Sequence, residues 1–278
     1  MENNFAVFII SHERSERVES YNTLIRGGYT GQVYIVIDDE DSQKYDYLNR
    51  FGERIVIFNK DDYINCDRIV QEQTRTSAVY ARNAVEHIAR KLELNSFAVL
   101  DDDIVSLRYR WPQDKVVKSL SVIGGLDDVF RWYTDYMIDT DIATLSFTQV
   151  MFYVGGVNNL EQRICDLRET YQIHIRNVSK PVDWSAIINE DIITELRTAK
   201  TGYIWWSIPY LVYDAVKMND KSGGVKELYD EMLANKRAML AVVSSPDCCK
   251  IGYSHGKIRI LQDRKSSYPM IISSEYRK

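Results

Sequence analysis

The chain has 278 residues, of which 45% are hydrophobic and 12% aromatic, and its formal net charge is −5. This length and apolar content suffice for one large α/β domain with a buried core, and they exclude a disordered chain. No run approaches eighteen apolar residues and no secretory signal pattern is visible, so we expect a cytoplasmic protein without a membrane span. The four cysteines show no CxxC spacing, which predicts reduced thiols and no structural zinc.

Apolar runs and helical patterns alternate along the first part of the chain. Residues 5–10 (FAVFII) are typical of a central parallel strand, and residues 33–37 and 55–58 repeat the pattern. The helix predicted after the first strand ends at Gly27-Gly28, and its apolar face is expected to comprise Val18, Tyr21, Leu24 and Ile25. Such alternation predicts a parallel sheet, whose ligands bind beyond the C-terminal strand ends. The polar residues expected there are Ser11, His12, Arg14, Asp38 and Asp39.

Two common phosphate-binding motifs are absent from the sequence. No GxGxxG follows the first strand and no GxxxxGK[ST] occurs anywhere, so nothing supports a dinucleotide dehydrogenase or a P-loop NTPase. A bound phosphate would need another partner. A divalent cation held by carboxylates and assisted by arginines fills that role.

The clearest predicted helix, residues 77–94, leads directly into an acidic strand end. Its apolar face is formed by Ala81, Val85, Ile88 and Leu92. The strand that follows, FAVLDDDI, ends in Asp101, Asp102 and Asp103. Adjacent carboxylates repel one another unless solvent or a cation neutralises them, so we interpret the triplet as a metal site. An acidic loop would be the simpler interpretation of the triplet alone, because the chain has 40 Asp and Glu residues.

Residues 78–104, AVYARNAVEHIARKLELNSFAVLDDDI, resemble the ARN-helix-strand-DxD segment of glycosyltransferases with the GT-A fold. With the opening FAVFIISHERSERV and the stretch VYIVIDDED, the chain looks most like the TET-associated glycosyltransferases. That group is found largely in phages and is thought to glycosylate hydroxymethylated pyrimidines in DNA. The resemblance implies an α/β, GT-A type fold: a mostly parallel sheet flanked by helices, with an acceptor-side elaboration in the second half.

The resemblance covers roughly the first 110 residues well and the rest loosely. It implies a nucleotide-sugar-binding core over residues 1–110 that ends in the DxD motif. Residues 111–278 would form the acceptor-side half, with the catalytic carboxylate and a C-terminal metal and diphosphate segment, in one continuous domain. A phage protein of this kind would act in the host cell cytoplasm.

The resemblance also implies a role for each strand-end residue. The nucleoside of a nucleotide-sugar, expected to be a UDP-sugar, would bind at Ser11, Arg14 and Asp38 or Asp39, with Arg82 near the donor. Asp101 and Asp103 match the acidic positions of DxD and would bind Mn²⁺ or Mg²⁺. Asp103 would be the more direct ligand, and Asp101 would lie closer to the ribose or a metal-bound water. Asp102 belongs with the donor-binding residues.

In the second half, Gly124-Gly125 opens a predicted helix and residues 142–147 (IATLSF) form a predicted strand. A basic and aromatic loop is expected before them, over Arg108-Tyr109-Arg110-Trp111. Bases stack on aromatic rings while arginines hold phosphates, so this loop is a candidate acceptor surface, although ordinary packing is the simpler explanation. The pair Trp205-Trp206 is expected in the core or at a dimer contact.

Glu190 and Asp191 precede an amphipathic run, so both carboxylates are expected at a helix N-terminus, where the helix dipole favours negative charge. Helix capping would account for them. In inverting GT-A enzymes, however, an acidic pair beyond DxD supplies the base that deprotonates the acceptor. By this resemblance Asp191 is the candidate base and Glu190 its alternative.

Near the C-terminus, His255 lies between two short strand-like runs. Many GT-A enzymes complete the metal sphere with a C-terminal histidine, so the resemblance implies that His255 is a third metal ligand. Lys257 and Arg259 would then be close to the diphosphate. Residues 250–278 carry a net charge of +5, which suits a diphosphate or DNA, although a solvated surface explains it more simply.

Together these features predict a metal-dependent glycosyltransferase that moves a sugar from a UDP-sugar to the hydroxyl of a hydroxymethylpyrimidine in DNA. Two alternatives stay open. One is a GT-A enzyme with a glycan, lipid or protein acceptor, and the other is a catalytically inactive nucleotide-sugar-binding module. The sequence leaves the sugar, the stereochemistry and the oligomeric state open.

Overall fold

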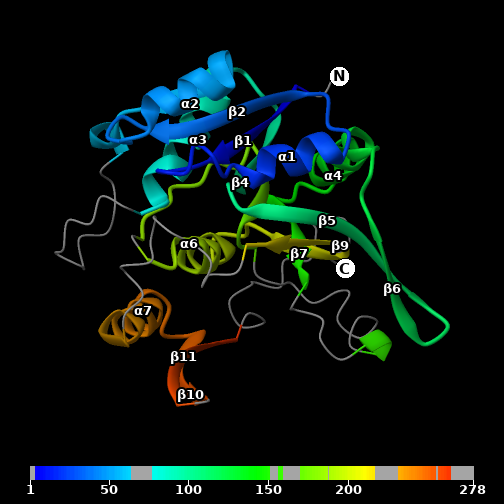
Figure 1. The fold of residues 1–278 in the computed structure, drawn as a ribbon. Coiled ribbons are helices and arrows are strands. Elements are labelled where there is room, and N and C mark those ends of the chain that lie inside the picture. The colour runs from blue at the N-terminus through cyan, green and yellow to red at the C-terminus, as the bar shows by residue number, and fades with distance from the viewer. Residues whose placement is uncertain are drawn as a thin grey trace.

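The computed structural model of the chain describes residues 4–63, 77–150, 156–158, 170–186, 188–216, 231–254 and 256–263. Its strands are β1 (Phe5–Ile10), β2 (Gln32–Asp38), β3 (Ile55–Phe58), β4 (Ser96–Asp101), β5 (Ile104–Gln113), β6 (Val116–Ser121), β7 (Thr144–Gln149), β8 (Ile173–Asn177), β9 (Trp205–Ala215), β10 (Cys249–Ser254) and β11 (Lys257–Gln262). The first nine form one sheet in the order β3-β2-β1-β4-β8-β7-β9-β5-β6, and the last two form a separate hairpin (Figure 1).

The strands β3, β2, β1 and β4 are parallel, so the C-terminal ends of β1, β2 and β4 lie at one edge of the sheet. Strand β8 enters antiparallel between β4 and β7. Beyond it, β7 and β9 are parallel, while β5 is antiparallel to both β9 and β6. The predicted α/β architecture, a mostly parallel sheet flanked by helices, is confirmed.

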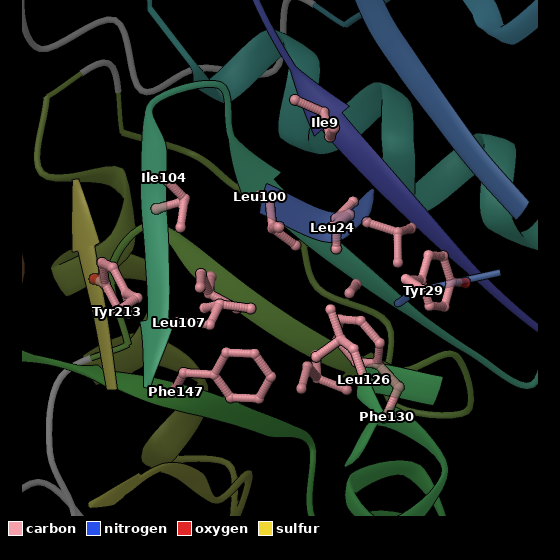
Figure 2. Packing of buried hydrophobic residues seen from close by; sticks show 14 of the residues in the cluster. Ile9, Leu24, Tyr29, Leu100, Ile104, Leu107, Leu126, Phe130, Phe147 and Tyr213 are labelled. Carbon is pink, nitrogen blue, oxygen red and sulfur yellow. The ribbon is translucent and has the colours of Figure 1, made fainter. Parts of the chain in front are cut away.

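Helices cover both faces of this sheet. They are α1 (Glu19–Arg26), α2 (Lys44–Phe51), α3 (Val79–Lys91), α4 (Leu126–Asp139), α6 (Glu190–Ala199) and α7 (Glu231–Ser244), with short 3-10 helices at Gly52–Arg54 and Lys60–Tyr63. Side chains alternate between the faces of a strand. In β1, Val7 and Ile9 therefore join the core cluster under α1, α2 and α4, which Figure 2 shows in part, while Ala6 and Phe8 join the cluster under α3.

Helix α6 packs its buried residues against α7 and the hairpin β10–β11. Ile192 and Leu196 of α6 share a small apolar cluster with Ala241 of α7 and with Cys248 and Cys249, whose thiols are not disulfide-bonded. The C-terminal elements are thereby attached to the sheet through α6. Among the described helices, none is both long and apolar enough to cross a membrane.

Three local predictions are wrong. Ile25 was assigned to the apolar face of α1, but that helix buries Ser20, Thr23 and Leu24 and leaves Ile25 54% exposed. Leu92 follows the end of α3 and is 39% exposed. Residues 108–111 are not a loop but part of β5, because they pair with both β6 and β9.

Candidate active site

The three aspartates occupy the connection between β4 and β5. Strand β4 ends at Asp101 and β5 begins at Ile104, so Asp102 and Asp103 form a tight turn at the C-terminal edge of the parallel strands. Backbone hydrogen bonds hold this turn from three other parts of the chain: Ser20 N donates to Asp102 O at 3.1 Å, Asp101 N donates to Gln172 O at 2.9 Å, and Val216 N donates to Asp103 O at 2.9 Å. The carboxylates therefore sit on a fixed backbone.

Asp102 ties the end of β4 to the end of β1. Its Oδ2 accepts a hydrogen bond from Ser11 Oγ at 2.7 Å, and its Oδ1 accepts one from Arg14 Nη1 at 2.9 Å. Ser11 Oγ also lies 2.6 Å from the hydroxyl of Tyr47 in α2. Burial raises the pKa of Asp102 although the Arg14 guanidinium opposes this shift. Ser11, Arg14 and Asp102, predicted to bind the donor, thus form one connected group.

A buried arginine joins Asp101 to the start of α6. Arg82 Nη2 lies 3.1 Å from Asp101 Oδ1, and Arg82 Nε lies 3.4 Å from Glu190 Oε1. The guanidinium also stacks over the ring of Trp184, 5.1 Å from its centroid, and its side chain is 3% exposed. Asp191 is close enough to act electrostatically on the same guanidinium. Carboxylates that are far apart in sequence therefore converge on the guanidinium of Arg82.

The crowding of these carboxylates shifts the pKa of Asp101. Burial first, and then the charges of Asp103, Asp102 and Glu190, raise the pKa of Asp101 to about 7, although Arg82 opposes the shift. A divalent cation would relieve this repulsion. Asp101 and Asp103 offer the hard oxygen ligands that Mn²⁺ and Mg²⁺ prefer, so the donor set fits the expected metal.

At the end of β2, acidic side chains meet two basic groups. His12 Nδ1 lies 2.7 Å from Asp38 Oδ2 and 3.6 Å from Asp41 Oδ2, and Lys60 Nζ lies 2.8 Å from Asp38 Oδ1. Lys60 also donates its backbone N–H to Asp39 Oδ1 at 3.1 Å. The hydrogen bond to Asp38 raises the pKa of His12. Burial favours a higher pKa for Asp38, but its bonds to His12 and Lys60 outweigh burial and lower it to about 2.

His12, Asp38 and Asp41 are near enough to one another to hold a metal ion. However, the ammonium of the buried Lys60 side chain already forms an ion pair with Asp38. A divalent cation beside this ammonium would be repelled. The group therefore fits hydrogen bonding to a polar ligand better than metal binding.

The sequence matches the TET-associated glycosyltransferase family over residues 5–224, which is more than half of the chain. The protein belongs to this family. It is therefore a glycosyltransferase, as its resemblance to that family predicted. No curated protein matches the sequence.

Solved structures show the same fold in distant proteins. One is a mannosyltransferase from Pyrobaculum calidifontis in complex with GDP-Man and Mn²⁺, with a TM-score of 0.50, 14% identity, and coverage of 78% of this chain and 58% of that one. Another is glucosyl-3-phosphoglycerate synthase from Mycobacterium tuberculosis in complex with Mg²⁺ and UDP, with a TM-score of 0.51, 7% identity, and coverage of 94% and 87%. These similarities confirm the GT-A fold of this TET-associated glycosyltransferase.

Several residues of the candidate site were not predicted from the sequence. Lys60 follows the end of β3, so the rule that located Asp38 would have found it. Tyr47, Gln172 and His174 contact site residues only through tertiary packing, and nothing in the local sequence indicates this.

The other predicted residues have mixed outcomes. Arg108 is paired with Asp214 of β9, and Arg110 donates to the Val150 carbonyl at 3.4 Å, so both arginines of the predicted acceptor surface have partners. Trp205 is fully buried in the core cluster under α3, as expected, and Trp206, partly buried, packs against the core cluster under α1, α2 and α4. His255 lies outside the described residues, and Lys257 opens β11.

Proposed function

We propose that this glycosyltransferase moves a sugar from a UDP-sugar to the hydroxyl of a hydroxymethylated pyrimidine in DNA, with Mn²⁺ or Mg²⁺ held by Asp101 and Asp103. The observation that carries the proposal is the contact of Arg82 with both Asp101 and Glu190. It brings the DxD motif and the acidic start of α6 together, as a transfer between donor and acceptor requires. The Mn²⁺, Mg²⁺, GDP-Man and UDP bound by the structural neighbours support the choice of cofactors.

The donor would lie along the ends of β1, β2 and β4. The hydrogen-bonding groups of Ser11, Arg14, Asp38 and Asp39 are concentrated there and would bind the nucleoside. When bound, the cation supplies positive charge to the departing diphosphate, whose developing charge is a main part of the barrier. Arg82 would add a second, fixed positive charge at the same place. His255 and Lys257 remain candidates for the metal and the diphosphate.

Asp191 is the better candidate for the base that takes the acceptor proton. Glu190 is held against the Arg82 guanidinium, so its carboxylate is already engaged by a cation. Asp191 follows it in the first turn of α6 and is close enough to act electrostatically on Arg82. A base placed there would accept the hydroxyl proton as the oxygen attacks the sugar. Glu190 would instead fix Arg82.

A DNA acceptor has to meet two requirements. An unmodified pyrimidine carries no alcohol for the attack, so the acceptor must be hydroxymethylated. The base must also leave the helix stack to reach a carboxylate at the sheet edge. The family to which the chain belongs supports this acceptor by its association with TET enzymes. In a phage-infected cell the reaction would take place in the host cytoplasm.

The test is a transfer assay with Mn²⁺ and the donors UDP-glucose, UDP-N-acetylglucosamine, UDP-galactose and GDP-mannose. DNA with hydroxymethylcytosine or hydroxymethyluracil should gain one sugar mass, and matched unmodified DNA should not. Metal-dependent donor hydrolysis without transfer to DNA would favour a glycan, lipid or protein acceptor. Donor binding without any turnover would identify an inactive binding module.

A further inference from the structure

One face of strand β8 carries a row of polar side chains directed toward α3. Gln172 immediately precedes the strand, and His174 and Arg176 follow at every second position, so all three share a face. His174 and Arg176 are fully buried. The intervening Ile173 and Ile175 belong to the apolar cluster on the opposite face of the sheet.

Two residues of α3 pair with this row. Arg82 and Glu86 are four positions apart and therefore lie on the same side of the helix. Arg82 Nη1 lies 3.0 Å from His174 Nδ1, and Arg176 Nε donates to Glu86 Oε1 at 2.9 Å. The helix is thus docked on β8 by polar contacts of defined geometry, and one of them involves the guanidinium that contacts Asp101.

The hydrogen bonds of His174 determine which ring nitrogen carries the proton. Nε2 lies 3.1 Å from the Thr170 carbonyl oxygen, which only accepts, so Nε2 carries the hydrogen. Nδ1 is then an acceptor for Arg82, which only donates. Burial and the charges of Arg82 and Arg176 keep the pKa of His174 well below its usual value, which agrees with a neutral ring. His174 thus fixes the direction of the Arg82 guanidinium.

Gln172 acts on the other acidic position of the motif. Its side-chain Nε2 donates to Asp103 Oδ1 at 2.9 Å, while its backbone carbonyl accepts from Asp101 N at 2.9 Å. A donor on one carboxylate oxygen limits rotation of the whole group. Residues that orient a ligand in this way typically change metal affinity by about 10- to 100-fold when they are replaced.

We propose that Gln172 and His174 are positioning residues of the glycosyltransferase site. His174 aims Arg82 at Asp101 and Glu190, and Gln172 orients the Asp103 carboxylate for the cation. The assignment rests on the proposed metal-dependent transfer. Neither residue needs to touch the donor or the acceptor.

The test of Gln172 is Mn²⁺ binding to the full-length protein without donor or acceptor, measured by the electron paramagnetic resonance signal of free Mn²⁺. Gln172→Met keeps the length of the side chain but removes the donor, and we expect at least tenfold weaker binding. Ile175→Val, on the opposite face of β8, is the matched control and should bind like wild type. Equal binding by Gln172→Met and wild type would overturn the role of Gln172, whereas a wild-type protein that binds no Mn²⁺ would overturn the proposed metal dependence instead.

The test of His174 compares two variants, His174→Asn and His174→Leu, whose side chains have similar shape and length. The amide oxygen of Asn can take the place of Nδ1 as an acceptor, whereas Leu cannot. We expect His174→Leu to lower kcat for donor turnover at least tenfold and His174→Asn to recover most of it, with thermal unfolding used to compare folded variants. If both variants match wild type, or both lose the same activity, His174 does not act through Arg82.

Discussion

At the scale of single residues, a carboxylate that is well placed to bind a cation can lower the stability of the cation-free protein. Asp103 is 6% exposed and lies beside Asp101 and Asp102. We expect Asp103→Asn to weaken Mn²⁺ binding by more than about 100-fold, beyond the range seen for supporting residues. The apo protein should be at least as stable as wild type, because a repelling charge is removed.

Calorimetry of Mn²⁺ binding and chemical denaturation of the apo protein measure these two effects separately. Asp139→Asn, an exposed carboxylate at the end of α4, is the control and should change neither. Unchanged Mn²⁺ affinity in Asp103→Asn would remove this residue from the proposed metal site.

Replacement of Asp191 should affect the rate of sugar transfer but not the binding of donor or metal. Asp191→Asn keeps the size of the side chain but removes the base, so the transfer rate at saturating donor should fall by about 10² to 10⁴. Donor and Mn²⁺ affinities should stay within a few-fold of wild type. Rapid-quench rates and donor calorimetry on the same variant check both statements. Lost donor binding with an unchanged rate would make Asp191 a donor ligand or a helix cap.

The pair of His12 and Asp38 makes stability depend on pH. The pKa of His12 is raised in the folded protein, so its contribution is present below about 6.5 and is lost as pH rises through the folded value. The pKa of Asp38 is lowered to about 2, so its contribution is present above about 4 and is lost toward that value. His12→Gln should therefore destabilise the protein more at pH 5.5 than at pH 8.5, as urea denaturation would show. An equal effect at both pH values would mean that the pKa of His12 does not change on folding.

At the scale of secondary structure, α3 is the element whose docking determines the site. The buried guanidinium of Arg176 donates hydrogen bonds to Glu86 Oε1, to the Ala143 and Lys180 carbonyls and to Thr144 Oγ1. Glu86→Ala leaves the buried Arg176 charge without its carboxylate partner. We expect a loss of about 3–5 kcal/mol in the free energy of unfolding.

Equilibrium denaturation of Glu86→Ala measures this loss, with the exposed Glu53→Ala as the control for removing a glutamate. Because Arg82 lies one turn earlier on α3, donor turnover should also fall while the variant is still folded. A loss below about 1 kcal/mol would show that the pair is not important for docking.

The predictability of each element followed from how local its determinants are. Strands β1 to β4 are largely continuous apolar runs, so their positions and the acidic ends of β2 and β4 were visible in the sequence. Strand β8 was not predicted, because IHIRN is short and buries His174 and Arg176 against partners that are distant in sequence. The same holds for the candidate site. Asp38 and Asp101 were predicted because they lie at strand ends, whereas Gln172 could be recognised only from its contact with Asp103 in the structure.

At the scale of the whole molecule, the net charge of −5 must be reconciled with the proposed DNA acceptor, which is a polyanion. The β5–β6 hairpin extends away from the body of the sheet (Figure 1) and carries exposed Lys115 and Lys118, the latter paired across the strands with Trp111. We expect DNA affinity to fall steeply with salt, and Lys115→Ala/Lys118→Ala to make the log–log slope shallower by about 2 if both lysines contact phosphates. Fluorescence anisotropy at several salt concentrations measures the slope, with the exposed Lys91→Ala as control. An unchanged slope would exclude the hairpin from DNA binding.

The position of β8 next to β4 also has a consequence for synthesis on the ribosome. Strand β4 has one neighbour, β1, that is made before it, but its other neighbour is made about 70 residues later. At ribosomal speeds of about 5–20 residues per second, that edge of β4 stays unpaired for roughly 4–14 s. During this interval the nascent chain presents the apolar strand that ends in the DxD motif as an open template for wrong pairing. The active-site edge of β4 is thus completed only after β8 has emerged from the ribosome.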